Sequence, residues 1–589
     1  MDRPALCRVL TFCFTCALNR SAVFRLATLS HMPIPMKRIS LALLALTWIA
    51  TALAAAPTMG MPRIEQRGDV KQLIVDDQPF LVLGGELHNS SSTSRHYMEP
   101  IWPKLSAMNL NTVLAVVPWD MIEPIEGKFD FTLVDQLVAD ARTHHLRLVL
   151  LWFGSWKNGF SHYVPEWVKR DRGRFPFAHL RSGTVEILST FGEASVTADA
   201  KAFAAMMRHL RTIDEAQRTV IMVQVQNEVG LHGDTRDRHP LADQVFAQPV
   251  PRELLNYLAT HRETLLPETR ALWQTMGFKS DGTWAEIFGS TPAADEAFMG
   301  WHYARYVDRV AAAGKAEYAL PMFVNAWIVQ LADEVPGEYP SGGPQAHMLD
   351  LWRAGAPYID LLAPDIYRSE FAAVCQLFTR SNNTLFVPES RAGAVGAANA
   401  FLTFGRFRGI GYSPFGIDAR ETDAANAPIL QAYDVLRQLT PLIVKHQASG
   451  TISAVSLDQH NPSEKISLGG YVLHASRLPD RRTNQTPELG YGLIMATAPN
   501  EFLVAGSDLQ ITFATDPLSQ ETVGLGTVEE GEFKQGQWVP GRRLNGDEIM
   551  LSYDVPALVA AQQTGTGLRL PSGKPTILRV SLYRFQAKP

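Results

Sequence analysis

The chain has 589 residues, of which 46% are hydrophobic and 19% charged, a composition typical of a folded protein of two or three domains. Its formal net charge is −5 and no long basic run occurs, which argues against nucleic acid or an anionic membrane surface as a partner. A neutral substrate fits this charge better, and the composition leaves the oligomeric state open.

The N-terminal segment has the pattern of a signal peptide. Residues 36–38 read Met-Lys-Arg, an apolar stretch follows over 39–50, and Ala-Leu-Ala occupies 52–54. We expect cleavage after about Ala54 and export, and we interpret residues 1–35 as an over-extended gene start. The alternative is a membrane anchor, although the apolar run is short for a span of about 20 residues. We expect no stable membrane partner, and the domain starts after this 1–54 leader.

Cysteine usage agrees with this interpretation. Cys7, Cys13 and Cys16 lie in the leader, so Cys375 is left alone and no intramolecular disulfide is possible in the mature chain. Cys375 sits in an apolar helical pattern, which predicts a small buried side chain and not a nucleophile. Export without disulfides is compatible with a bacterial periplasm.

From about residue 80 to 420, short apolar runs alternate with longer helical patterns, which is typical of βα units and a parallel sheet. Eight strands separated by helices favour an α/β fold with a (β/α)8 TIM barrel over residues 55–425. The alternative is an open doubly wound sheet, but the first strand has no Gly-x-Gly-x-x-Gly after it and no Walker-type motif occurs. The eight predicted strands are 80–88, 112–119, 147–153, 220–226, 321–327, 360–367, 385–389 and 409–415.

The connection after the fourth strand is much longer than an ordinary βα loop. Helical patterns at 254–261 and 284–313 predict a helical insertion over residues 231–320. Because it follows the carboxyl end of a barrel strand, we expect it to overhang the active-site face and to shape substrate access. The alternative is additional bulk with no role in binding.

Residues 426–589 have a different pattern. A helical stretch at 429–446 is followed by short alternating runs with Gly, Pro and Asn between them, which predicts a helical connection and an all-β, sandwich-like accessory domain. No long flexible spacer occurs, so we expect this domain to pack tightly against the barrel. The predicted strands include 492–497, 501–504, 509–515, 548–553 and 576–583.

Two glutamates follow apolar strands of the predicted barrel. Glu228 ends the fourth strand and Glu389 ends the seventh, where side chains point into a barrel's active site. A carboxyl group at such a position is costly to bury unless it is paired, protonated or used, and the alternative for each is a structural salt bridge. Together they have the arrangement that cleaves a glycosidic bond, with Glu228 as general acid/base and Glu389 as nucleophile. A retaining mechanism predicts that their carboxyl groups lie ~5 to 5.5 Å apart.

Two segments carry a family resemblance. Residues 118–131 read Pro-Trp-Asp-Met-Ile-Glu-Pro-Ile-Glu-Gly-Lys-Phe-Asp-Phe and resemble the Pro-Trp-x-x-His-Glu-Pro-x-x-Gly-x-Tyr-x-Phe segment of glycoside hydrolase family 35 β-galactosidases. Residues 226–230, Gln-Asn-Glu-Val-Gly, are similar to that family's acid/base motif. The resemblance covers about residues 75–420.

The resemblance implies a retaining, exo-acting β-galactosidase that removes terminal, non-reducing galactose. The C-terminal part resembles the extra β domain of a bacterial subgroup, which includes enzymes acting on galactosylated plant polysaccharides. A substrate such as galactosylated xyloglucan is implied by that likeness.

The chain departs from the family pattern at two places. Ile122 replaces the usual His before Glu123. The segment that often reads Gly-Pro-Tyr-Ile-Cys-Ala-Glu-Trp appears as Phe-Gly-Ser-Trp-Lys-Asn at 153–158, without the Glu that commonly contacts galactose, and Lys157 and Asn158 are candidates to replace it. The alternatives are a retaining β-glycosidase for another sugar and a non-catalytic carbohydrate-binding protein.

Polar and aromatic residues near the strand ends form a candidate sugar-binding site, because aromatic faces pack on the C–H side of a sugar while carboxylates and amides bind its hydroxyls. Asn227 in particular is placed to bind the 2-hydroxyl. We find no His, Asp and Glu cluster with metal-ligand spacing and expect neither a metal nor a cofactor. The other candidate binding residues are Glu86, His88, Trp119, Glu123, Trp156, Asn158, Trp327 and Tyr367.

Overall fold

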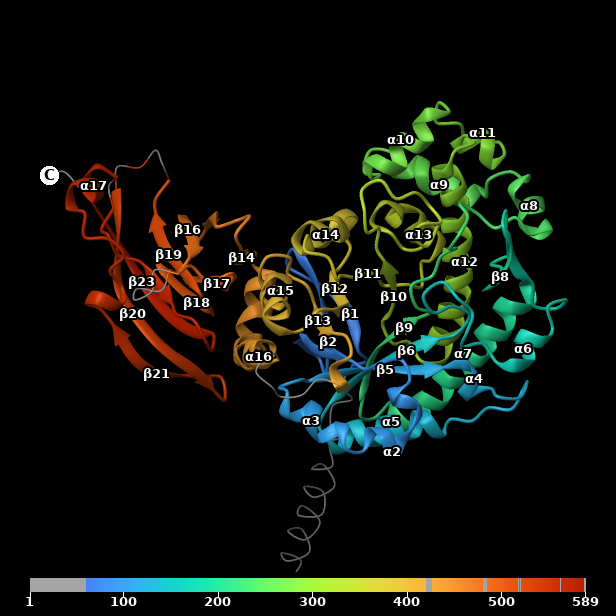
Figure 1. Ribbon diagram of the computed structural model, residues 1–589, viewed down its shortest axis with the longest axis horizontal. Helices are drawn as coiled ribbons and strands as arrows, with labels where there is room; N and C mark the ends of the chain where they lie inside the picture. The colour runs from blue at the N-terminus through green and yellow to red at the C-terminus, as the bar shows by residue number, and fades with distance from the viewer. Residues whose placement is uncertain are drawn as a thin grey trace, which may run out of the picture. The chain divides into compact units, whose positions relative to one another are not determined.

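The computed structural model describes residues 60–419, 426–479, 485–516, 519, 521–561 and 563–586, and within these ranges eight parallel strands form the central sheet (Figure 1). The predicted leader and its three cysteines lie outside the described residues. Every predicted barrel run overlaps one of these strands. They are β4 (Val82–Glu86), β5 (Thr112–Pro118), β6 (Arg147–Phe153), β9 (Val220–Val225), β10 (Met322–Trp327), β11 (Leu361–Asp365), β12 (Phe386–Ser390) and β13 (Gly411–Pro414).

The sheet closes into a barrel, which confirms the predicted fold. The strand order is β11-β10-β9-β6-β5-β4-β13-β12. Between its two ends, the backbone N–H of Ile366 donates to the carbonyl oxygen of Glu389 at 2.9 Å, and Ile366 forms a parallel bridge with Ser390. Closure brings the carboxyl ends of all eight strands to one rim.

Side chains that alternate along the strands fill the barrel and cover its outside. Leu114 and Val116 of β5 belong to the inner cluster, whereas Val113 and Val117 pack outward against the helices. Leu73 of β2 (Val70–Val75) joins the inner cluster as well. The barrel is therefore a packed core, and only its rim is open to polar residues.

Helices follow the strands and pack on the outside of the barrel. They include α5 (Thr132–Thr143), α7 (Glu193–Asp214), α12 (Pro292–Glu317), α13 (Leu349–Gly355), α14 (Phe371–Phe378), α15 (Gly393–Gly405) and α16 (Ala427–Ala448). Ahead of α7, the chain forms α6 (Glu166–Arg170) and a hairpin of β7 (Phe177–Leu180) and β8 (Gly183–Leu188), which the sequence pattern did not predict.

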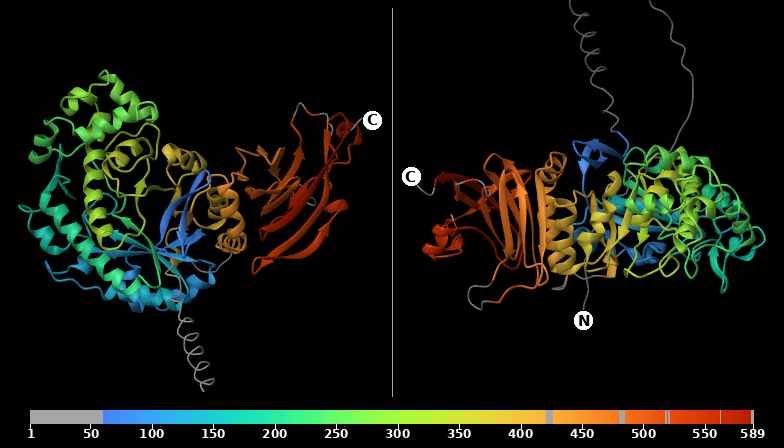
Figure 2. Two further views of the ribbon diagram at one scale, coloured as in Figure 1. Left: turned by 180° about the vertical axis from the view of Figure 1, so that it is seen from behind. Right: turned by 90° about the horizontal axis from the view of Figure 1, so that it is seen from above.

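The insertion between β9 and β10 is helical, with α8 (Pro240–Phe246), α9 (Arg252–Thr260), α10 (Pro267–Thr275) and α11 (Trp284–Phe288) ahead of α12. Figure 2 shows these helices, in green, grouped together beside the barrel strands. The helical stretch predicted over 284–313 forms two helices, α11 and α12, with a break at residues 289–291. Gly289 adopts φ +86° and ends α11, while Thr291 caps α12 and Pro292 begins it.

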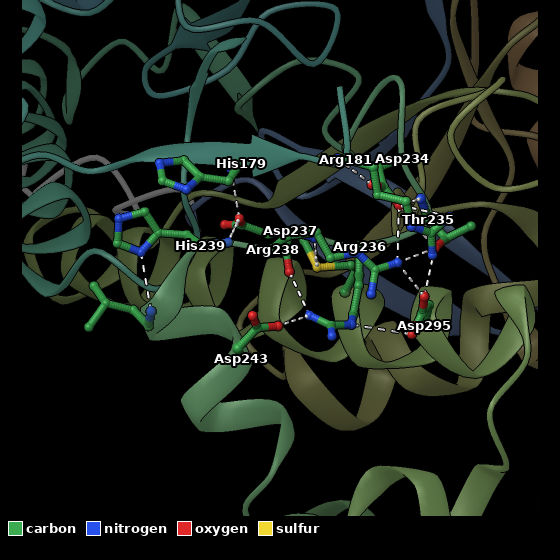
Figure 3. Close-up of polar contacts among 12 residues, drawn as sticks. His179, Arg181, Asp234, Thr235, Arg236, Asp237, Arg238, His239, Asp243 and Asp295 are labelled. Carbon is green, nitrogen blue, oxygen red and sulfur yellow. Dashed lines mark hydrogen bonds and ion pairs between the residues drawn. The ribbon is translucent and has the colours of Figure 1, made fainter. Parts of the chain in front are cut away.

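Polar contacts hold the first part of the insertion (Figure 3). Asp237 accepts hydrogen bonds from the backbone N–H groups of His179 at 3.0 Å and His239 at 2.7 Å. Arg238 donates to Asp234 at 3.1 Å and to Asp295 of α12 at 2.8 Å. These bonds fix the loop after β9 between the β7–β8 hairpin and α12.

The C-terminal region is a sandwich of two antiparallel sheets, of order β14-β17-β18-β23-β20-β21 and β15-β16-β19-β22. Both sheets contribute to one apolar core, for example through Val504 and Leu473. The expected strand at 548–553 is wrong, because only Met550 makes a bridge, to Thr566. The strands are β14 (Ile452–Leu457), β15 (Ser463–Leu468), β16 (Tyr471–Arg477), β17 (Gly490–Ala498), β18 (Glu501–Ser507), β19 (Leu509–Ala514), β20 (Glu521–Lys534), β21 (Gln537–Leu544), β22 (Leu568–Leu570) and β23 (Thr576–Gln586).

The barrel and the sandwich share buried apolar contacts within one compact unit of residues 59–589. The rings of Phe401 on α15 and Tyr491 on β17 lie 5.2 Å apart between centroids. A Cβ added to Gly405 would lie 2.6 Å from the Cβ of Ala454, so α15 and β14 approach closely there. Such a contact favours a fixed arrangement over a flexible linker.

Close packing of α12 on α7 predicts a stability effect at Gly314. A Cβ at this position would lie 2.2 Å from Cε1 of Phe203. Helix propensity alone favours Gly314→Ala by about 1 kcal/mol, but overpacking costs about 1 to 3 kcal/mol, so we expect the variant to unfold at a lower urea concentration.

Gly173→Ala is the matched control, because the nearest atom to its added Cβ is 3.7 Å away. We expect it to change the free energy of unfolding by less than about 0.5 kcal/mol. A Gly314→Ala variant at least as stable as the parent would show that α7 and α12 can separate without cost.

Candidate active site

Four carboxyl groups meet at the rim of the barrel. Glu86 ends β4, Asp365 ends β11, Glu389 lies in β12, and Glu228 follows β9. All four are buried, with at most 7% of their surface exposed. The structure thus brings the two predicted catalytic glutamates together with Glu86 and adds Asp365.

Burial and mutual repulsion raise the pKa values of three of these groups. Burial is the largest effect on the pKa of Glu228, which rises to about 7, and the negative charge of Glu389 contributes in the same direction. Lys157 and a hydrogen bond with Asp365 act the opposite way on Glu228. Burial and the charge of Glu389 also place the pKa values of Glu86 and Asp365 well above their usual range.

The backbone around Glu228 is strained and held by side chains. Gln226 and Glu228 adopt φ values of +66° and +46°, a region that costs a non-glycine residue about 1 kcal/mol or more. The Glu228 backbone N–H donates to Oδ1 of Asn325 at 2.9 Å. The Asn227 N–H donates to the carbonyl oxygen of Trp156 at 3.1 Å. These bonds fix the direction in which Glu228 leaves the strand.

Asp199 of α7 also holds the segment that carries Glu228. Its carboxylate accepts hydrogen bonds from Nε2 of Gln226 at 2.7 Å, from Nε1 of Trp152 at 2.8 Å, and from the N–H and hydroxyl of Ser155 at 3.1 and 2.6 Å. Gln226 also accepts from the Trp156 N–H at 3.1 Å. One buried carboxylate therefore connects the loops that follow β6 and β9.

Glu389 has one oxygen engaged and one without a partner. Its Oε1 accepts a hydrogen bond from the hydroxyl of Tyr367 at 2.6 Å, while its buried Oε2 has no partner among the described residues. Burial, followed by the charge of Glu389, raises the pKa of the Tyr367 hydroxyl, so this group remains a donor. Predicted binding residue Tyr367 therefore contacts the proposed nucleophile.

Among the described residues, several buried polar atoms of these carboxyl groups and of the loops that follow β6 and β9 have no hydrogen-bond partner. Buried polar groups are normally hydrogen-bonded, so such a group of atoms indicates where a polar ligand binds. Three of the predicted binding residues, Glu86, Asn158 and Asn227, are among them. Within the described ranges the unpartnered atoms include Glu86 Oε1, Asn158 Oδ1, both amide atoms of Asn227, His232 Nε2, Asp365 Oδ1 and Glu389 Oε2.

The observed bonds of Trp119, Glu123 and Trp156 are with other protein groups. Glu123 is 1% exposed and accepts from Nε1 of Trp119 at 3.1 Å and from the N–H of Gly127 at 2.7 Å. Trp156 is fully buried, and its Nε1 donates to the carbonyl oxygen of Leu188 at 3.1 Å. These contacts hold loops in place, and sugar binding by these residues stays a prediction.

His88 and Trp327 lie nearer to solvent. His88 is bonded to Asp418, through its N–H at 2.9 Å and its Nδ1 at 3.1 Å. The ring of Trp327 lies edge-to-face with His232 at 5.5 Å between centroids, and His232 stacks on Phe160 at the same distance. This aromatic group lies beside the segment that follows Glu228.

Cys375 is buried and free, as its apolar surroundings predicted. In the part of the chain that the structure describes, no three or more His, Cys, Asp or Glu residues are grouped so as to hold a metal ion. None of the helices described is long and apolar enough to cross a membrane.

Asp365, Asn325 and Asp199 were not predicted from the sequence. Asp365 follows an apolar run as Glu228 and Glu389 do, so the same rule about strand ends selects it. Asn325 lies within β10, and an amide inside a buried strand is a weaker indication of a site than a carboxyl group at a strand end. Asp199 lies in a helix, and nothing local distinguishes it from a solvent-facing carboxylate.

Two family matches cover separate parts of the chain. Residues 72–299 match Glycosyl hydrolases family 35, and residues 429–555 match a Domain of unknown function (DUF5597). A β-galactosidase of Xanthomonas manihotis is 28% identical over 34% of this chain and 32% of its own length. Beta-galactosidase 8 of Oryza sativa subsp. japonica is 25% identical over 34% of this chain and 29% of its own length. The match thus spans about a third of each relative.

Solved structures align at low similarity. The β-galactosidase of the psychrophilic Marinomonas ef1 has a TM-score of 0.42 and 12% identity over 63% of this chain and 62% of that one. The catalytic domain of a β-amylase from Paenibacillus polymyxa has a TM-score of 0.41 and 11% identity over 60% and 97%. The fold assignment therefore rests on the strand order. The resemblance to glycoside hydrolase family 35 is confirmed by the match over residues 72–299, and the second match, over residues 429–555, runs from α16 into the sandwich.

Proposed function

We propose that this chain is a retaining, exo-acting β-galactosidase that hydrolyses terminal non-reducing β-galactosyl residues of plant-derived glycans such as galactosylated xyloglucan. The observation that supports it most is the pair of buried carboxyl groups, Glu228 with its raised pKa and Glu389 with one oxygen held by Tyr367. The family 35 match and the names of the relatives favour galactose as the sugar.

In the first step, Oε2 of Glu389 attacks the anomeric carbon while the bond to the leaving oxygen breaks. Glu228 gives its proton to that oxygen. The Tyr367 hydroxyl holds Oε1 and orients the attacking carboxylate. A glycosyl ester on Glu389 and the free aglycone result.

In the second step, water attacks the anomeric carbon and the ester bond to Glu389 breaks. Glu228 has lost its proton and now accepts one from this water. Because the ester has no charge, the repulsion that kept Glu228 protonated is absent during this step. The free sugar is released, and Glu228 and Glu389 return to their starting ionisation states.

The helical insertion begins directly after Glu228, which must lie beside the leaving group. We therefore place the aglycone toward this insertion and toward the aromatic group of Trp327, His232 and Phe160. We also propose export to the periplasm, on the signal-peptide pattern over residues 36–54.

Removing Glu228 and removing Glu389 should have different effects on galactosides with poor leaving groups and on activated ones. Glu228→Ala should reduce the rate by about 10²- to 10⁴-fold for galactosides with poor leaving groups, and spare the first step for activated ones. Azide should then restore turnover and give β-galactosyl azide. Glu389→Ala should lose activity on both substrates, and any azide product should be the α-anomer.

The stereochemistry of the azide products checks the assignment. Glu166→Ala serves as a control for handling, because Glu166 is exposed and lies in the outer helix α6. Azide products of the opposite anomeric form would require the two roles to be exchanged.

The raised pKa of Glu228 predicts the pH dependence. The first step needs protonated Glu228, so kcat/KM for an unactivated galactoside should fall as pH rises above about 7. The Glu228→Ala variant should lose this alkaline decline. If that variant keeps an alkaline decline of kcat/KM with the same midpoint, the decline arises from another group.

A panel of 4-nitrophenyl glycosides tests the sugar, because Lys157 and Asn158 stand where the family commonly has a galactose-binding Glu. We expect the highest kcat/KM for the β-galactoside among the β-galactoside, β-glucoside and β-mannoside. Product analysis on galactosylated xyloglucan fragments should show release of galactose. Preference for another sugar would leave the glycosidase chemistry and reject the galactose assignment.

A further inference from the structure

Two carboxyl groups suffice for the proposed reaction, yet four lie within the site. Glu86, Glu228, Asp365 and Glu389 are all buried, and Lys157 is the cation that acts on both Glu86 and Glu228. If all four were ionised, this buried group with one lysine would carry three uncompensated negative charges. Such a state is strongly unfavourable at low dielectric.

Asp365 lies among three other carboxyl groups. Burial raises its pKa most, and the negative charges of Glu389, Glu228 and Glu86 act in the same direction. It lies directly before Ile366, which closes the barrel onto Glu389, so its backbone position is fixed. Among the described residues, Asp365 has no ion pair that would favour its ionised form.

One amide links Asp365 to the proposed acid/base. Nδ2 of Asn325 donates to Oδ2 of Asp365 at 2.6 Å, and Oδ1 of the same amide accepts the backbone N–H of Glu228 at 2.9 Å. The carboxyl groups of Asp365 and Glu228 lie within hydrogen-bonding reach of each other. The arrangement leaves Oδ1 of Asp365 without any donor in the described part of the chain.

Two ionised carboxylates have no proton to share, so a hydrogen bond between Asp365 and Glu228 requires a proton on one of them. When Glu228 is ionised, only Asp365 can supply it. The bond then stabilises the carboxylate form of Glu228, which is the form that acts as base.

We propose that Asp365 is a positioning residue that stays protonated throughout the catalytic cycle and donates a hydrogen bond to Glu228. With Asp365 neutral, the negative charge that serves catalysis lies first on Glu389 and then, in the glycosyl-enzyme, on Glu228. The proton of Asp365 is not transferred, so the two-carboxylate reaction keeps its balance. This role in catalysis rests on the proposed function.

Asp365→Asn and Asp365→Ala separate a neutral hydrogen-bond donor from a charge. The Asn amide retains the acceptor for Asn325 and a donor for Glu228, so we expect kcat within about 3-fold of the parent and an alkaline midpoint of kcat/KM moved by less than about 0.3 pH unit. Asp365→Ala removes the donor, so the midpoint should rise by about 1 pH unit and kcat should fall about 10-fold.

Two outcomes of these pH profiles overturn the proposal. If Asp365 were ionised, Asp365→Asn would remove a negative charge beside Glu228 and lower the midpoint instead. If Asp365 had no part in positioning, Asp365→Ala would match the parent. Glu86, Glu228, Glu389, Lys157 and Tyr367 are unchanged in both variants, so differences between the variants report on Asp365 alone.

Infrared spectroscopy tests the proton without any assay of activity. At pH 8, the parent should show a C=O stretch of protonated carboxylic acid that decreases in Asp365→Asn, with Glu86→Gln as the matched variant at a second buried carboxyl group whose pKa is raised. Equal spectra of parent and Asp365→Asn would reject a protonated Asp365. This result stands even if no galactoside is cleaved, and therefore separates failure of this inference from failure of the proposed function.

Discussion

The site depends on burying four carboxyl groups beside one lysine. Desolvation, followed by repulsion from Glu389, raises the pKa values of Glu86, Glu228 and Asp365, and this favours a protonated acid at Glu228. Because the negative charge of Glu389 helps to hold the proton on Glu228, formation of the ester on Glu389 would release it. The same electrostatic coupling therefore serves both steps of the proposed reaction.

This coupling requires precise placement, and the barrel provides it through backbone closure and buried polar bonds. The contact between Ile366 and Glu389 completes the barrel next to Asp365. Asp199 and Asn325 hold the strained segment that carries Glu228 from two sides. The fold therefore maintains a strained backbone conformation in the segment that carries Glu228. This conformation costs free energy and does not itself stabilise the protein.

Much of the fold was predictable from local pattern. Buried parallel strands are short apolar runs separated by amphipathic helices, and each predicted run overlaps one barrel strand. The missed β7–β8 hairpin and the wrongly predicted strand at 548–553 have a common cause. Isolated two-stranded ribbons and irregular segments depend on tertiary contacts, which a local sequence pattern does not contain. Of the site, Glu228 and Glu389 were predictable because they follow apolar strands. Asp199 was not, because its role depends on which loop its helix faces.

The proposed reaction depends on Glu228 and Glu389 acting as a retaining pair. Proton NMR of the anomeric region during early turnover of a β-galactoside tests it most directly, because the first product observed has not yet mutarotated. A retaining pair releases β-galactose first, and the α-anomer appears later at the rate of mutarotation. Initial release of α-galactose would contradict it and require a water between the two carboxyl groups in a single displacement.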